Sequence, residues 1–119
     1  MTPDERQLLN AKIAVFLRDA FVRIRFLTFP TARLEAMEDG TDPAREVNDL
    51  ADLCHNLPRY LVGHDEDAVV SERQLRETIA EYIRRFYPKI DPAQHRYVQL
   101  FEMDEAAFRH TYARHLAMA

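Results

Sequence analysis

Apolar residues recur with the period of an α-helix through most of this chain, and turn residues separate the helical stretches. The clearest case covers residues 42–63, where apolar and polar side chains follow the same three- and four-residue steps on opposite sides. The apolar positions are Val47, Leu50, Cys54, Leu57 and Leu61, and the polar positions are Arg45, Asp49, Asp52, Asn56 and Arg59. We therefore expect an amphipathic helix here with one buried side.

Capping residues set the limits of this helix. Asp42 is the expected N-cap, followed by Pro43 at the first helical position, and Gly63 is a suitable left-handed stop. Pro58 removes a helix hydrogen bond, so we expect a kink or break near Asn56–Leu57 and a short second turn over 59–62.

A long helix is predicted to run from the Thr2-Pro3-Asp4-Glu5 capping box to about Leu27. Its apolar residues form two stripes, Leu9, Ile13, Phe16, Ala20, Ile24, Leu27 and Leu8, Val15, Val22, Phe26. Such a wide apolar arc is typical of the central helix of a bundle, covered on more than one side. Arg18, Arg23 and Arg25 then lie at its solvated edge or pair with acidic residues elsewhere.

Four further helical segments follow from the same reasoning. A short one covers 30–38, and one begins at Ser71 with a capping box to Gln74 and ends before Pro88. Its expected buried residues are Leu75, Ile79, Tyr82, Ile83 and Phe86, with ion pairs Glu72–Arg76 and Glu81–Arg85 on its surface. Asp91-Pro92 starts a helix to about Glu102, with Tyr97, Leu100 and Phe101 inward, and Asp104 caps the last helix.

The expected fold is all-α: one helical domain over residues 1–119, a bundle of about five helices with a long, central N-terminal helix. Two glycines and 47% apolar residues fit packed helices. A single cysteine makes no internal disulfide, and the N-terminus lacks the layout of a signal peptide. The longest apolar run, 13–17, is too short to cross a membrane. We expect a cytoplasmic protein that does not act at a membrane.

Charge is distributed unevenly along the chain. Residues 35–81 contain 13 acidic and 4 basic residues, a net charge of −9, within a protein of net charge −4. An acidic block favours a basic partner and repels nucleic acid. The last third is basic, with tyrosines between its arginines, so a small DNA-binding regulator is a weaker alternative.

Catalytic and metal-binding patterns are not found. Cys54 and His55 are adjacent, and neighbours on a helix point about 100° apart, too far for a nucleophile–base pair. Asp49, Asp52 and His55 have ligand chemistry, but they do not share one face, and two isolated glycines make no phosphate loop. We expect no enzyme activity, no cofactor and no metal.

The segments NDLADLCHNLPRYL (48–61) and HDED (64–67), the small size and the missing catalytic signature together carry a resemblance. The chain resembles the small, acidic, all-helical immunity proteins of bacterial toxin systems, including those of contact-dependent inhibition. The resemblance implies that an acidic surface blocks the active site of a basic toxin, often a nuclease, by standing in for its anionic substrate. Those proteins share no motif, so it assigns no role to any residue.

The residues themselves also favour a protein-binding surface around the central helix. Carboxylates steer and pair with a basic partner, and an aromatic residue anchors it. We expect the contact surface to comprise Asp49, Asp52, His55, Asn56, Tyr60, Asp65, Glu66 and Asp67, with Tyr60 as the anchor. The main alternative is a homo-oligomeric regulatory or scaffolding protein, such as a homodimer, in which a second copy completes the apolar arc of the first helix.

Overall fold

The computed structural model describes residues 2–57 and 72–114, and these fold into six α-helices and one short 3₁₀-helix with no β-strand. The helices are α1 (Pro3–Phe26), α2 (Pro30–Glu38), α3 (Pro43–Asn56), α4 (Glu72–Phe86), α5 (Arg96–Glu102) and α6 (Glu105–Thr111), with η3 (Pro92–Gln94) before α5. The predicted all-α fold is confirmed, with more helices than the five expected.

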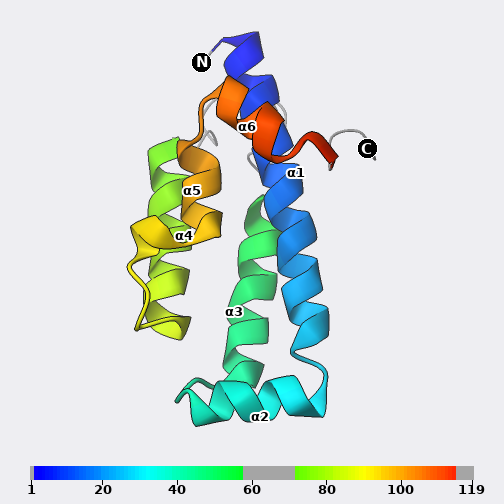
Figure 1. Ribbon diagram of the computed structural model, residues 1–119, viewed down its shortest axis with the longest axis vertical. Helices are drawn as coiled ribbons and strands as arrows, with labels where there is room; N and C mark the ends of the chain where they lie inside the picture. The colour runs from blue at the N-terminus through cyan, green and yellow to red at the C-terminus, as the bar shows by residue number, and fades with distance from the viewer. Residues whose placement is uncertain (1, 58–71, 115–119) are drawn as a thin grey trace.

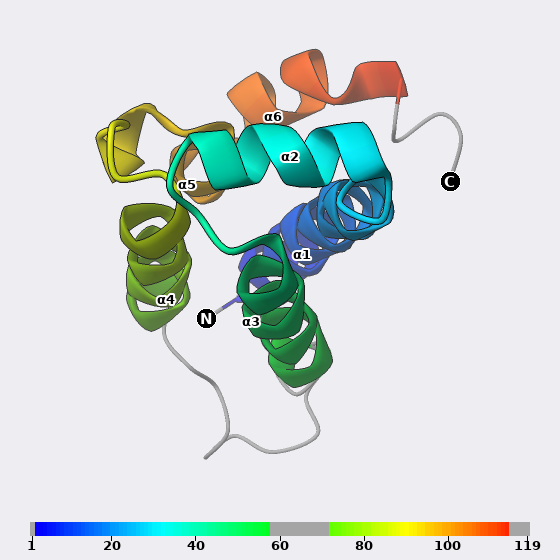
Figure 2. The same cartoon turned by 90° about the horizontal axis from the view of Figure 1, so that it is seen from below.

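Helices α1 and α3 lie side by side, and α2 crosses their lower ends (Figure 1; Figure 2 shows the same crossing from below). α4 packs against α5 and η3 to form the other side of the bundle. α6 lies against the N-terminal half of α1, where Leu8, Ala11 and Phe108 line a common pocket. α1 contacts both α3 and α5, which gives it the central place predicted for it.

The core is built on the predicted faces of α1 and α4. Phe16 is fully buried at its centre, with its ring edge-on to Tyr97 at 5.1 Å and close to Phe101 at 6.1 Å. All five residues predicted to form the buried face of α4 are buried: Leu75, Ile79, Tyr82, Ile83 and Phe86. Edge-on aromatic pairs of this kind add about 0.5–1.5 kcal/mol beyond the area they bury.

Helix caps appear where the sequence places them. The Thr2 side chain accepts a hydrogen bond from the Glu5 amide, and the Glu5 carboxylate accepts one from the Thr2 amide. Asp42 caps α3 and Asp104 caps α6. α3 ends at Asn56, as the proline at 58 predicts, because a proline cannot continue the hydrogen-bond ladder. The expected second turn over 59–62, the stop at Gly63 and the Ser71 cap lie outside the described residues.

Two predictions about helices were wrong. The helix expected from Asp91 to Glu102 is divided, because His95 adopts an extended backbone and caps α5 with its own side chain. The apolar arc of α1 is not covered along its whole length either. Its second stripe is covered at Leu8 and Val15, but Val22 and Phe26 are exposed because α6 packs against the N-terminal half alone.

Candidate functional site

The outer face of α3 carries the described part of the predicted contact surface. Asp52, His55 and Asn56 are all exposed, and their spacing of three and four residues puts them side by side on one helix face. Tyr60, Asp65, Glu66 and Asp67 lie outside the described residues. The structure therefore brings together three of the eight predicted residues at solvent.

Asp49 departs from the expected polar stripe. Its carboxylate is half-buried and accepts a hydrogen bond from Arg85 of α4 at 2.6 Å. The predicted pair Glu81–Arg85 is therefore wrong: Glu81 pairs with Arg84, one residue earlier, and Arg85 reaches across to α3. Because Arg85 already neutralises the Asp49 carboxylate, Asp49 would attract a basic partner less strongly than Asp52 would.

A buried carboxylate on α3 was missed by sequence reasoning. Glu46 has no exposed surface, and its two carboxylate oxygens accept hydrogen bonds from the Arg23 guanidinium at 2.8 and 3.3 Å. The hydroxyl groups of Tyr82 and Tyr87 donate to the same carboxylate at 2.8 and 3.1 Å. This cluster of Arg23, Glu46, Tyr82 and Tyr87, the Glu46 network, joins α1, α3 and the C-terminal end of α4.

The helical spacing of the sequence indicates that Glu46 lies on the buried face of α3. It stands four residues before Leu50 and eight before Cys54, on the line of the buried stripe rather than the polar one. An acid in such a position requires a partner, because an unpaired buried charge costs several kcal/mol. The partner is Arg23. It is one of the three α1 arginines expected either to lie at the solvated edge of the helix or to pair with acidic residues.

The two phenol groups of the Glu46 network, on Tyr82 and Tyr87, have raised pKa values and stay protonated at neutral pH. Burial, reinforced by the neighbouring phenol and carboxylate, raises the pKa of Tyr82 far above its usual value, and burial together with Glu46 raises the pKa of Tyr87 to about 12. Burial by itself would lower the pKa of Arg23, but the hydrogen bond to Glu46 and the charges of Glu46, Tyr82 and Tyr87 together outweigh it and raise that pKa. The network therefore keeps its hydrogen-bond donors through the neutral range and acts as a rigid link between helices.

Cys54 does not have the properties of a catalytic nucleophile. Its side chain lies on the buried face of α3, and burial raises the pKa of the thiol to about 11. A thiol with such a pKa is almost entirely protonated at neutral pH, whereas the thiolate is the reactive form. His55 next to it points to solvent.

His95 is half-buried beside the Glu46 network. Its ring lies 5.3 Å from Tyr87 and 4.6 Å from Tyr97, and its Nδ1 accepts a hydrogen bond from the Tyr97 amide at 3.1 Å. Burial, together with the charges of Arg96 and Arg23, lowers the pKa of His95 to about 4. The neutral imidazole is thus the form that caps α5.

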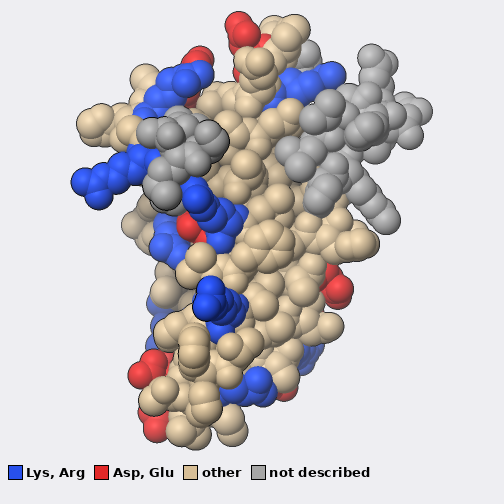
Figure 3. Space-filling model, turned by 90° about the vertical axis from the view of Figure 1, so that its right-hand side faces the viewer, with Lys and Arg blue, Asp and Glu red and all other residues tan. Residues whose placement is uncertain are grey.

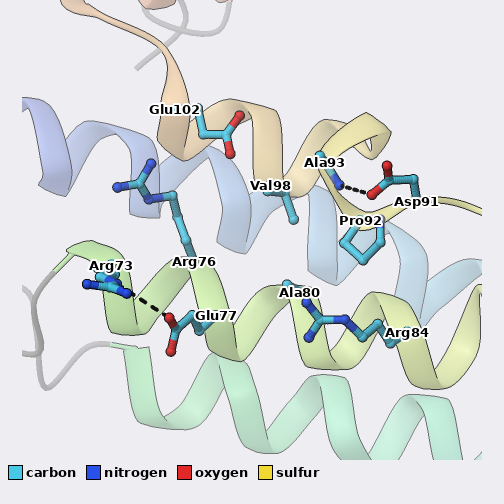
Figure 4. Close-up of a pocket in the computed structure, with 10 residues that line it drawn as sticks. All are labelled: Arg73, Arg76, Glu77, Ala80, Arg84, Asp91, Pro92, Ala93, Val98 and Glu102. Carbon is cyan, nitrogen blue, oxygen red and sulfur yellow. Dashed lines mark hydrogen bonds and ion pairs between the residues drawn. The ribbon is translucent and has the colours of Figure 1, made fainter.

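A groove of about 400 Å³ lies between α4 and the η3–α5 segment (Figure 4). Arg73, Arg76, Arg84 and Glu77 come from α4, and Asp91 and Glu102 stand on the other side, over an apolar floor of Ala80, Pro92, Ala93 and Val98. Arg73 pairs with Glu77 at 3.5 Å, and Asp91 caps η3 through the Ala93 amide. Its three positive and three negative side chains give the groove no net charge to select a ligand.

The face of α1 that points away from the core differs from this groove, because its exposed side chains in the C-terminal half of the helix are apolar or basic. Phe21, Val22 and Phe26 are all exposed on it, with Arg18 and Arg25 between them. Figure 3 shows a broad, mostly uncharged surface on this side of the molecule, with blue basic groups on it and few red acidic groups. The apolar arc of α1 that the sequence predicted to be covered thus forms part of the molecular surface.

In the described ranges 2–57 and 72–114, no three His, Cys, Asp or Glu side chains gather into a group that could hold a metal ion. None of the helices within those ranges is long and apolar enough to cross a membrane. Comparison of the chain with protein-family models, with curated proteins and with solved structures gave no match.

Proposed function

We propose that this protein is a non-catalytic binding protein whose α3 face captures a basic protein, in the manner of an immunity protein that neutralises a bacterial toxin. The observation that supports the proposal best is the set of Asp52, His55 and Asn56, exposed together on one face of a rigid helix. Among the described residues, Asp52 has no ion-pair partner, so its charge is available to another molecule.

Rigidity is the second support. The Glu46 network fixes α3 to α1 and α4, so the α3 face loses little conformational freedom when a partner binds. A pre-organised surface binds more tightly than a mobile one because less entropy is lost on binding. The acids of residues 35–81 would attract a basic partner from a distance and increase the association rate.

The test uses tagged protein to capture partners from lysate of the source cells, at low and at high salt. We expect one basic protein in stoichiometric amount, retained by the wild type and lost with Asp52→Lys, since the substitution replaces an attractive charge by a repulsive one. Glu102→Lys is the matched control, because it makes the same change of charge at an exposed position on α5. Equal capture by Asp52→Lys and the wild type would refute the α3 face as the binding site.

Self-association is the alternative that one observation favours, the exposure of Phe21, Val22 and Phe26 on α1. A second copy packed on these residues would cover the apolar arc, and the protein would then be a homo-oligomeric regulatory or scaffolding protein. Light scattering on a sizing column distinguishes the two proposals. A stable dimer that Phe26→Ser converts to monomer would favour the alternative.

A further inference from the structure

Five exposed residues in the C-terminal part of α1 form one stripe. They are Arg18, Phe21, Val22, Arg25 and Phe26, spaced three and four residues apart. Exposed Phe29 follows just beyond the end of α1, as the N-cap of α2, and we name the six residues together the basic–aromatic surface. The apolar members are 59% (Phe21), 63% (Val22), 45% (Phe26) and 53% (Phe29) exposed. Water therefore covers large apolar side chains that the sequence pattern would place in a core.

The two arginines of this stripe have no acidic partner within the described residues. Some other arginines of the protein are held in ion pairs, for example Arg23 with Glu46 and Arg85 with Asp49. No described carboxylate lies within 4 Å of Arg18 or Arg25. Each guanidinium thus keeps its full set of planar donors, which match a carboxylate in a two-bond geometry.

Exposed phenylalanine and arginine together are typical of protein-binding surfaces. Aromatic residues and arginine are enriched in interfaces, and they account for most of the binding energy there. Three phenylalanine side chains about half exposed leave on the order of 300 Å² of apolar surface at this site. A surface of that size accommodates one face of a helix.

We propose that the basic–aromatic surface binds an acidic amphipathic helix of a partner protein. The apolar side of such a helix would cover Phe21, Val22 and Phe26, while its carboxylates would pair with Arg18 and Arg25. This site is separate from the α3 face and does not depend on the function proposed for that face.

A second copy fits the surface less well, for two reasons. In a twofold dimer the same patch faces itself, so Arg18 and Arg25 of both copies would meet with no carboxylate between them. The apolar area is also well below the roughly 800 Å² per partner of a stable interface.

An anionic membrane or a nucleic acid fits less well because α2 follows directly after Phe29. Glu35, Glu38 and Asp39 are exposed there, and an extended negative surface would meet them as well as the arginines. A single helix can contact the arginines and avoid the acids.

The experiment measures binding of a fluorescent synthetic helix of about 20 residues, long enough to form in water, with leucine on one side and glutamate on the other. Fluorescence anisotropy compares it with a lysine-for-glutamate copy and with a scrambled copy of the same composition. Protein variants are Arg18→Glu/Arg25→Glu, Phe21→Ser and the matched control Arg45→Glu/Lys89→Glu. The control makes the same change of charge at exposed positions outside the stripe.

We expect micromolar binding of the acidic amphipathic helix alone, weakened at least about tenfold by Arg18→Glu/Arg25→Glu and by added salt. Phe21→Ser should weaken it several-fold, and the control should leave it unchanged, with circular dichroism confirming that every variant is folded. The proposal is overturned if the scrambled peptide binds equally well or if none binds at about 1 mM. It is also overturned if phosphatidylserine vesicles bind more tightly through the same arginines, or if the protein dimerises through them.

Discussion

At the scale of single residues, Glu46 is the most consequential side chain in the fold. It is fully buried, and its carboxylate accepts hydrogen bonds from one guanidinium and two phenols. A buried ion pair gains little over a well-packed apolar core, but breaking one leaves an uncompensated charge, which costs about 3–5 kcal/mol. The stability of the protein should therefore respond strongly to a change at this position.

We expect Glu46→Gln to lower the free energy of unfolding by about 2–4 kcal/mol, because Arg23 loses its counter-charge and an amide nitrogen, which cannot accept, replaces one of the two acceptor oxygens. Glu81→Gln is the control: it removes an exposed pair with Arg84 and should cost less than about 1 kcal/mol. Urea unfolding followed by circular dichroism measures both. Similar losses in the two variants would contradict the central place given to Glu46.

His95 gives the fold a dependence on pH. Its pKa is about 4 in the folded protein and near 6.5 in an unfolded chain. Between those values the unfolded chain binds more protons, so stability falls as the pH is lowered from 6.5 towards 4 and is unaffected by this group above 6.5. Protonation also turns the Nδ1 acceptor that caps α5 into a donor.

Replacing His95 by Asn tests this, because asparagine keeps a capping acceptor and does not titrate. The wild type should lose on the order of 1–2 kcal/mol more stability than His95→Asn between pH 6.5 and 4, a range that allows for the partial solvent exposure of the ring. Thermal unfolding at several pH values provides the measurement. Parallel pH profiles for the two proteins would show that His95 is not the group responsible.

At the scale of elements, α5 and α6 are attached to α1 through a buried lysine. Lys12 is 2% exposed, and its ammonium group donates to the backbone carbonyls of Phe101 at 3.4 Å and Met103 at 2.6 Å. These carbonyls lie at the end of α5, where the carbonyl acceptors of a helix lack N–H donors within the helix and where the helix dipole attracts positive charge. The lysine thus holds the end of one helix against the middle of another.

Lys12→Met retains the aliphatic stem and removes the donors, so it should cost about 1–3 kcal/mol of stability. Lys89→Met, at an exposed turn position, should stay within about 0.5 kcal/mol of the wild type. Hydrogen exchange should locate the effect of Lys12→Met at the amides of α5 and α6. Uniform loss of protection over all helices would argue against a local attachment.

At the scale of the whole molecule, folding redistributes the charge that is concentrated in one block of the sequence. Glu46, Asp49 and Glu81 belong to the acidic block of residues 35–81, yet each pairs with an arginine from outside it. Within the described part of the chain, the surface that remains has exposed acids on α2 and α3 and, on α1, Arg18 and Arg25 without an ion-pair partner. We therefore expect a monomer on a sizing column and separate partners for the two faces.

Local sequence patterns predict the helices, most of their ends and most of the apolar residues of the core. These follow from local rules: a capping side chain, a proline or a three- and four-residue apolar repeat acts within one or two turns. Such rules predicted α1, α2, α3, α4 and α6 and the buried face of α4. They did not predict the division before α5, because Asp91 caps only the short η3 and His95 then interrupts the helix and caps α5 with its own side chain.

The environment of each side chain, in contrast, is set by tertiary packing, since it depends on residues distant in sequence. The periodic pattern puts Glu46 on a buried face but does not say that Arg23, Tyr82 and Tyr87 meet it there. The same pattern gives α1 a wide apolar arc but does not say that α6 covers one half of it. Which apolar side chains are covered and which charged groups pair depends on how the helices pack. The pairing of Glu46 and the exposure of the α1 phenylalanines therefore follow from the tertiary structure and not from the periodic pattern.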